Sequence, residues 1–418
     1  MGDTPFLKSE SSMETNQNIS PATNGQVHID QNKFHLNNIL AIATAHATHD
    51  TYTGFLAPLL PIIIGNLQLS NTAAGLLSVF MRMPSLLQPL IGYVADRHNL
   101  RIFIILTPAI SAVMMSLVGI APNYAVVVMF LFLTGASSAF LHAVAPVITG
   151  RLSGNNLGRG MSFWMVGGEF GRVLGPLVIV FAIEKLTLPH TPWIMIPGLI
   201  ASLLLYFVLR NVPVQIPQQN IAAQAMKGTL KSMLKFMLPI FVLLSLRSLL
   251  FAGSTMFLPT YLNERGEGLL FSGAALSVLE SAGILGALLG GSVSDRIGRK
   301  TIIFFSVFLT PILTFLFLNS SGWMSMILLA CIGFTMLCVT PAIMAMVQEN
   351  YAESRALANG VYMAINFVSS STGILLVGML GDTFGLASAI KISAIILFIG
   401  LPSVFFLPNR RKSEPAMN

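Results

Sequence analysis

The chain has 418 residues, of which 54% are hydrophobic and only 9% are charged. A soluble domain usually carries about 25% charged residues, so a globule of this length could not cover its surface with so few charges. The composition excludes an ordinary soluble domain and predicts a protein whose solvent is largely lipid. The net charge of +7 does not indicate a nucleic-acid partner, because the basic residues stand in short gaps between apolar runs.

Twelve apolar segments follow one another along the chain, most of them near the roughly 20 residues that span a bilayer. The first 36 residues are polar and lack the order of a signal peptide, so we expect a disordered cytoplasmic tail there. The spans are expected near residues 37–64, 72–94, 101–120, 125–148, 160–184, 192–210, 237–261, 271–293, 301–319, 324–347, 356–380 and 387–408.

The basic residues of the gaps fall mainly on one side of the membrane. If the chain starts in the cytoplasm, the cytoplasmic gaps and the C-terminus hold fifteen Lys and Arg residues, and the opposite side holds three. This bias predicts an inner-membrane protein with both termini in the cytoplasm.

The longest gap, residues 211–236, divides the chain after six spans. Lys227, Lys231 and Lys235 recur there every four residues. A short helix on the anionic inner leaflet and a plain solvated linker are both consistent with that spacing. The predicted units are a tail (1–36), a six-helix bundle (37–210), a cytoplasmic central loop (211–236), a second six-helix bundle (237–408) and a second tail (409–418).

The two halves repeat a motif after their second span. Residues 92–101 read GYVADRHNLR and residues 291–300 read GSVSDRIGRK, with Asp96 and Asp295 199 residues apart. The fold class expected from this repeat is an all-α membrane protein of twelve transmembrane helices in two pseudo-symmetric bundles, with a substrate site between them.

This motif resembles the Gly-x-x-x-Asp-Arg-x-Gly-Arg-Arg/Lys pattern of the major facilitator superfamily. An Asp in this loop can accept bonds from a neighbouring helix N-terminus, and the Arg residues can bind cytoplasmic partners or lipid. The motif is therefore expected to act as a conformational latch between the bundles. The matching residues are Gly92, Asp96, Arg97 and Arg101 in the first copy, and Gly291, Asp295, Arg296, Gly298, Arg299 and Lys300 in the second.

Three further stretches resemble the fosmidomycin-resistance branch of efflux proteins in this superfamily. They are AHATHD at 45–50, LLQPLIGY at 86–93 and GGEFGRVLGPL at 167–177. The resemblance implies secondary active transport, usually export of a small molecule coupled to proton entry. The chain departs from the branch at Glu169 and Arg172, where the glycine run is usually uncharged.

Nine ionisable side chains fall well inside the predicted spans, away from their ends, where each costs at least about 2.5 kcal/mol on insertion scales. At about 1.5 Å per residue, Arg82 stands about 21 Å from Asp96, and Glu280 stands about 22 Å from Asp295. Both depths suit the central site of a transporter. The nine are His46, His49, Asp50, Arg82, His142, Glu169, Arg172, Arg247 and Glu280.

The charges of the two halves are related by the repeat. A shift of 198 residues takes His49 to Arg247 and Arg82 to Glu280. With Asp50 beside His49, this predicts either two pseudo-symmetric ion pairs or one four-charge network.

Proton coupling is expected at the carboxylates of this set, because a carboxylate that loses its Arg partner in a dry cavity takes up a proton more readily. Asp50 is the preferred carrier, because His46 and His49 can relay a proton to it. Glu280 is the second candidate.

Substrate contacts are expected from Arg82, Arg247, Glu169, Arg172 and His142, because guanidinium groups pair bidentately with anions. Other roles stay open for some of them. Arg82 could satisfy backbone carbonyls near a proline. Glu169 and Arg172 could neutralise each other, and His142 could be a packing donor.

No metal or cofactor is predicted. His46, His49 and Asp50 have the spacing of metal ligands, but a single helix supplies too few of them. A P-loop, a Gly-x-Ser-x-Gly elbow and a two-Cys metal pair are also missing from the sequence, so neither an enzyme nor an ATP-driven pump is expected.

The leading prediction is a monomeric transporter in the lipid bilayer that exports a small organic compound, with an anion favoured, in exchange for protons. Proton-coupled uptake of an anionic metabolite or a siderophore is the alternative, because this fold does not fix the direction of transport. A membrane receptor is a third class, for which the tail and the central loop are too short.

Overall fold

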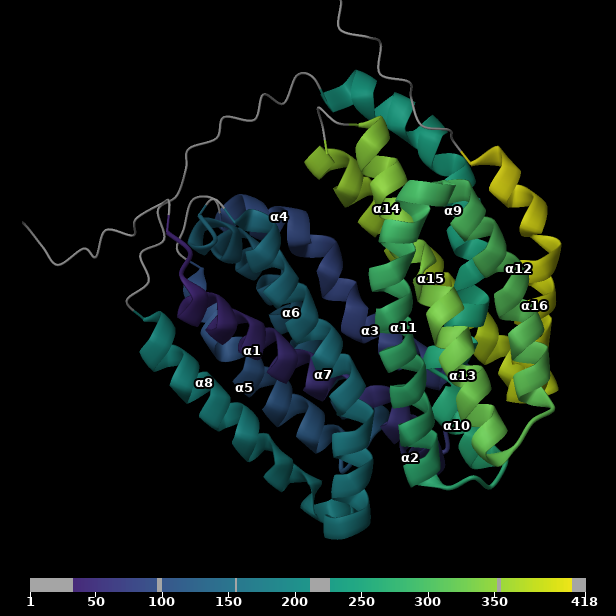
Figure 1. Ribbon diagram of the computed structural model, residues 1–418. Helices are drawn as coiled ribbons and strands as arrows, with labels where there is room; N and C mark the ends of the chain where they lie inside the picture. Colours follow the sequence, from purple (N-terminus) through teal and green to yellow (C-terminus); the bar gives the residue numbers. More distant parts are fainter. Residues whose placement is uncertain (1–32, 96–99, 155, 211–225, 352–354, 408–418) are drawn as a thin grey trace, which may run out of the picture.

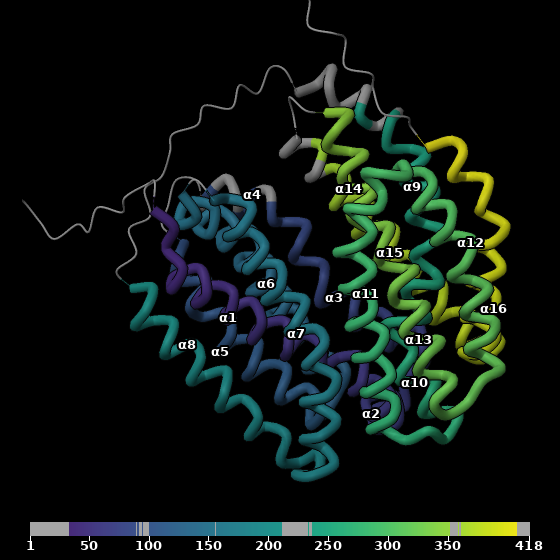
Figure 2. Tube along the Cα trace, in the orientation of Figure 1, coloured from purple at the N-terminus to yellow at the C-terminus, as the bar shows by residue number. Residues whose placement is uncertain are grey.

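The computed structural model describes residues 33–95, 100–154, 156–210, 226–351 and 355–407. Within these ranges the chain forms helices and turns and no β-strand. Helix is the form expected for apolar segments of this length, because lipid offers no partner to a free backbone N–H or C=O. The helices form two bundles that stand side by side (Figures 1 and 2).

The first bundle holds the helices of the N-terminal half. Its elements are α1 (Leu36–Thr53), α2 (Leu56–Leu67), α3 (Asn71–Arg82), the 3-10 helix η1 (Met83–Leu87), α4 (Gln88–Ala95), α5 (Arg101–Val118), α6 (Tyr124–Leu152), α7 (Leu157–Leu186), the 3-10 helix η2 (Leu188–Ile194) and α8 (Met195–Leu209).

The second bundle holds the helices of the C-terminal half. Its elements are α9 (Met226–Thr255), α10 (Leu258–Glu264), α11 (Leu269–Ile297), α12 (Arg299–Leu318), α13 (Gly322–Leu337), α14 (Val339–Asn350), α15 (Arg355–Phe384), α16 (Leu386–Ile399) and the 3-10 helix η5 (Leu401–Phe406).

Nine of the described helical stretches are long and apolar enough to cross a membrane. The other three predicted spans are each divided into shorter elements: 37–64 into α1 and α2, 72–94 into α3, η1 and α4, and 387–408 into α16 and η5. The second span is divided at Pro84. Proline has no backbone N–H, so it cannot donate the hydrogen bond that would continue an α-helix. The twelve predicted spans thus have helical counterparts, and the protein is a multi-pass membrane protein.

The first span of each half is divided at a matching place. The first span breaks between α1 and α2 at Gly54 and Phe55, and the seventh breaks between α9 and α10 at Met256 and Phe257. Both Phe side chains are fully buried. The repeat therefore extends beyond the loop motif to the shape of the first helix in each half.

The helix that leads into the seventh span begins inside the range expected for the central loop. Residues 211–225 lie outside the described part of the chain, and α9 already begins at Met226. Met226–Phe236, expected to form a linker or a separate surface helix, is instead the first part of the long helix that becomes the seventh span.

Glycine residues let α1 and α7 approach closely. A Cβ on Gly167 would meet the carbonyl oxygen of Ala43, and one on Gly171 would meet that of Ala47. A Cβ on Gly175 would lie 2.9 Å from the Cα of Gly54. These three glycines form a stripe along α7 at intervals of four residues, and the stripe makes a close crossing with α1. It places the charged residues of α1 directly against α7.

The two halves touch mainly through α3 with α15, α7 with α11, and α2 with α10. In Figure 1, α2 and α10 lie at one end of the bundles, opposite α4 and α14. Asp382 at the end of α15 caps the start of α3 across this contact, because its carboxylate accepts bonds from the Asn71 amide at 2.5 Å and the Thr72 amide at 3.0 Å. A carboxylate at a helix N-terminus also opposes the positive end of the helix dipole.

The glycine crossing can be tested by adding one methyl group. Gly171→Ala places a Cβ against the Ala47 carbonyl and 2.8 Å from the Asp50 Cβ, so α1 and α7 must move apart. We expect a loss of about 1–3 kcal/mol, measured as a lower Tm in detergent. Gly65→Ala on α2 is the control, since its Cβ meets no atom within 4 Å. Equal Tm values for the two variants would contradict the close crossing.

The cap between the halves can be tested by removing its carboxylate. Asp382→Ala should weaken the contact by about 1 kcal/mol, which changes a two-state equilibrium about fivefold. The measurement is the labelling rate of a cysteine placed at Ile374, a residue only 3% exposed in the contact between α3 and α15. Cys331→Ser and Cys338→Ser remove the native thiols, and Asp382→Asn keeps one acceptor oxygen. An unchanged rate in Asp382→Ala would show that the cap does not hold the halves together.

Candidate functional site

A cavity of about 190 Å³ lies between the two halves. The first half lines it with residues of α1, α2, α3 and α7, and the second half with residues of α9, α11 and α13. The break residues Gly54 and Met256 are both in its wall. Three charged side chains face it, namely Arg82, Arg172 and Glu280.

Arg172 is the centre of the charged group in this cavity. Its guanidinium forms an ion pair with Glu169, one turn back on α7. Its Nε also lies 3.9 Å from an Oε of Glu280 on α11. The Arg172 side chain is 43% exposed and the Glu280 side chain 15%. The pair thus joins the two halves while the guanidinium keeps an open face.

Arg82 enters the same cavity from the C-terminal end of α3. A cation at this position opposes the negative end of the helix dipole. It has no carboxylate within 4.0 Å among the described residues. Its guanidinium is therefore a free binding group in the wall of the cavity.

Arg247 lies outside this group. Its Nη2 donates to the carbonyl oxygen of Met336 at 2.5 Å, near the end of α13, where a helix leaves carbonyl groups without an intrahelical partner. Within the described chain, neither Asp50 with Arg82 nor Arg247 with Glu280 comes within 4.0 Å. The predicted pseudo-symmetric ion pairs are therefore wrong for this conformation.

The helical period explains this error. The repeat aligns Arg247 with His49, and Asp50 is the next residue along α1. One residue turns a side chain by about 100° around the helix axis, so Asp50 faces a different neighbour.

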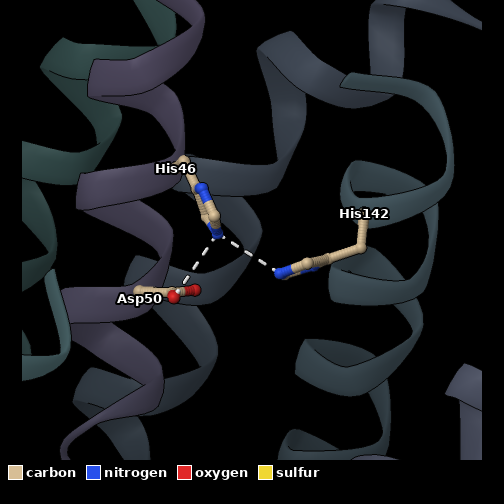
Figure 3. Close-up of side chains that lie close together, drawn as sticks. All are labelled: His46, Asp50 and His142. Carbon is tan, nitrogen blue, oxygen red and sulfur yellow. Dashed lines mark hydrogen bonds and ion pairs between the residues drawn. The ribbon is translucent and has the colours of Figure 1, made fainter. Parts of the chain in front are cut away.

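Asp50 belongs to a second cluster inside the first half (Figure 3). One carboxylate oxygen lies 3.5 Å from His46 Nε2, and the other lies 3.9 Å from His49 Nε2. His46 Nε2 lies 3.2 Å from His142 Nε2 on α6. The predicted coupling residues of α1 are thus together, and His142 joins them instead of the cavity.

The rings of this cluster are held by neighbouring helices. His46 stacks on Trp164 of α7, with ring centroids 3.7 Å apart. Its Nδ1 lies 2.9 Å from the Trp164 carbonyl oxygen. His142 Nδ1 lies 2.9 Å from the Ser138 carbonyl oxygen of its own helix. Each ring is therefore fixed so that Nε2 points into the cluster.

The second copy of the loop motif lies in the described part of the chain, and its ion pairs and side-chain hydrogen bonds there join residues of the second half. Arg299 Nη2 lies 2.7 Å from both Asp295 and Glu349, and Nη1 donates to Ser294 Oγ at 2.7 Å. Gly298 has a φ of +97°, a conformation that glycine adopts without strain. Asp96 and Arg97 of the first copy lie outside the described residues, so the latch between the bundles stays a prediction.

Sequence reasoning missed several residues of the cavity and the contact between halves. Thr53, Ser78 and Thr255 line the cavity. An uncharged polar residue in a helix does not indicate how deep in the membrane it lies or which way its side chain faces. Asp382 stands at the very end of the eleventh span, where a carboxylate needs no special explanation. Asp382 is 310 residues from Thr72 in the sequence, so no local sequence pattern indicates that they are in contact.

Two helical bundles in a membrane with a charged cavity between them define the architecture of a secondary transporter. The sequence matches the family model of the Major Facilitator Superfamily over residues 42–296 and 268–417. The chain belongs to this superfamily of transporters.

Two of the proteins similar in sequence are resistance proteins. A fosmidomycin resistance protein of Escherichia coli strain K12 is 25% identical over 385 residues, which cover 89% of this chain and 93% of that protein. The multidrug resistance protein MdtG of Citrobacter koseri is 22% identical, covering 86% and 92%.

Solved structures show the same fold at lower identity. A bacterial homologue of the human lysosomal transporter Spinster has a TM-score of 0.74 at 15% identity, covering 92% of this chain and 100% of that one. A D-xylose–proton symporter has a TM-score of 0.72 at 14% identity, covering 90% and 98%.

Proposed function

We propose that this transporter exports a small organic anion by alternating access, coupled to proton entry. The observation that supports the proposal is the cavity between the halves, where two guanidinium groups and one carboxylate face the same space. A binding site between two bundles becomes open to each side in turn when the bundles rock.

The two guanidinium groups favour an anion as substrate. Arg82 has no carboxylate within 4.0 Å among the described residues, and Arg172 keeps an exposed face beside its two glutamates. Guanidinium binds a carboxylate or a phosphonate through two parallel hydrogen bonds, which supplies orientation as well as energy. A planar or tetrahedral anionic group bridging Arg82 and Arg172 is the substrate feature that the cavity suits.

The direction of transport is proposed from the similar proteins. The similar proteins that cover most of the chain include a fosmidomycin resistance protein and a multidrug resistance protein. The halves also meet through Asp382 and α3 at the end that the positive-inside pattern predicts to be extracellular. In this conformation, an anion would reach Arg82 and Arg172 from the cytoplasm.

We propose Glu280 as the proton carrier. Its pair with Arg172 connects α11 and α7, so separation of these helices in the outward-facing state would leave the Glu280 carboxylate without its cation. A carboxylate without its cation binds a proton more readily. Glu280 would take up a proton on the outer side and release it when Arg172 returns. Asp50, by contrast, pairs inside one half and faces histidine rings.

Uptake is a second candidate because of the same pair. An anion that occupies Arg172 releases Glu280, and a proton on Glu280 releases Arg172. Each ligand therefore favours binding of the other, and this coupling is reciprocal. Such mutual support suits movement of the anion and the proton in the same direction.

The anion site can be tested in inside-out membrane vesicles with radiolabelled fosmidomycin as the probe. Loss of one charged hydrogen-bonding group costs about 1.5–3 kcal/mol, so Arg82→Ala should raise KM about tenfold or more. Arg82→Lys keeps the charge and should lose less. Lys391→Ala, an exposed cation on α16, is the matched control. Wild-type vesicles that do not accumulate the probe, or an Arg82→Ala variant with an unchanged KM, would contradict the proposed site.

The direction and the carrier can be tested through the lumenal pH of the same vesicles. Adding the anion outside should make the lumen alkaline if transport is antiport, and acidic if it is symport. Glu280→Gln keeps a similar shape but cannot titrate, so it should exchange anion for anion without any pH change. Glu264→Gln on α10, outside the cavity lining, should behave as wild type. A full pH response in Glu280→Gln would exclude Glu280 as the carrier.

A further inference from the structure

Two histidine rings in the first half point nitrogen lone pairs at each other. His46 Nδ1 and His142 Nδ1 each lie 2.9 Å from a backbone carbonyl oxygen, which can only accept a hydrogen bond. Ser138 Oγ lies farther from His142 Nδ1, at 3.3 Å. Each neutral ring therefore carries its hydrogen on Nδ1, and the two Nε2 atoms meet at 3.2 Å with no hydrogen between them. A cation is what would join these two atoms.

A third lone pair and a carboxylate lie beside them. His49 Nδ1 is 2.5 Å from Ser111 Oγ, whose own hydrogen is donated to the Thr107 carbonyl at 2.8 Å. The His49 hydrogen is therefore on Nδ1 as well. Its Nε2 is completely buried without a hydrogen-bond partner and lies 3.9 Å from Asp50. Three imidazole lone pairs thus surround one carboxylate, with no donor among them.

The spacing of these atoms fits a tetrahedral metal ion. Bonds of about 2.0–2.1 Å at tetrahedral angles place neighbouring ligand atoms about 3.3–3.4 Å apart. The observed distances from His46 Nε2 are 3.2 Å to His142 Nε2 and 3.5 Å to Asp50. The three ligand atoms all lie within 4.8 Å of one another. The Nδ1 bonds to carbonyl oxygens are the outer contacts that orient metal-binding histidines.

We propose that His46, Asp50 and His142 form a binding site for a divalent transition-metal ion (Figure 3). Two imidazoles and one carboxylate suit Zn²⁺, Co²⁺ or Ni²⁺ better than Mg²⁺ or Ca²⁺, which prefer oxygen ligands alone. His49 stands next to the site, with its Nε2 3.9 Å from the Asp50 carboxylate. The sequence did not predict it because the third ligand comes from α6, 92 residues after Asp50.

The proposed ion is a resident of the first half and not the transported substrate. All three ligands belong to α1 and α6, and none lines the cavity between the halves. Rocking of one bundle against the other therefore leaves the ligand set intact. Arg172 on α7, a cation of the same half, is engaged by Glu169 and Glu280, and the Asp50 carboxylate offsets one charge of the ion.

The site can be tested with Co²⁺, whose visible absorption reports tetrahedral coordination. The full-length protein, purified in detergent and treated with a chelator, should bind one Co²⁺ per chain, and Zn²⁺ should displace it. Cys331→Ser and Cys338→Ser in the same chain exclude thiol ligands. His142→Ala and His46→Ala should weaken binding at least about tenfold. His190→Ala, on the exposed segment before α8, should leave it unchanged.

Two results would overturn the proposal. One is Co²⁺ binding of equal strength in wild type and His142→Ala, and the other is no stoichiometric binding in wild type. The second result would indicate that the two rings share a proton and bind no metal ion. His142→Gln replaces His142→Ala if that variant does not fold, and a rise in the wild-type Tm with Zn²⁺ gives an independent measure. Metal binding is measured without an anion, so it can fail while the proposed transport holds, and the reverse is also true.

Discussion

The absence of water from the bilayer core limits where a charge can lie inside the membrane-spanning part of this protein. A charge in lipid needs a partner or an aqueous cavity, and the structure provides three kinds of environment. Arg172 and Glu280 pair across the cavity between the halves. Asp50 is surrounded by histidines inside the first half. Arg247 donates to a backbone carbonyl near the end of α13. The halves are similar in backbone, but their charges are used in different ways.

The broken helices connect the backbone to this arrangement of charges. In both halves the first span is divided at a buried Phe, and the residue on its N-terminal side lines the cavity. The second span is divided at Pro84, directly after Arg82. A break ends the helical bonding pattern and changes the direction of the following segment. The cavity lies beside these breaks, with Gly54 and Met256 in its wall.

The sequence predicted the fold well because its signals are local. Apolar run length, the alternation of basic gaps and two copies of one loop motif are each read from neighbouring residues. The depth of Arg82 and Glu280 also followed from counting along a helix, and both line the cavity. The pairing of charges could not be predicted in this way. It depends on which face of each helix points inward, so Asp50 met His46 and His49 instead of Arg82, and His142 joined them from a distant helix.

The Asp382 cap has a consequence for thermal motion. The groups that it satisfies are backbone amides at the start of α3, and water can take its place when the halves part. A helix cap stabilises by only about 0.5–2 kcal/mol, which is one to a few times the thermal energy at room temperature. Thermal fluctuations therefore break this cap often, and the packing of α3 against α15 supplies the rest of the contact between the halves there.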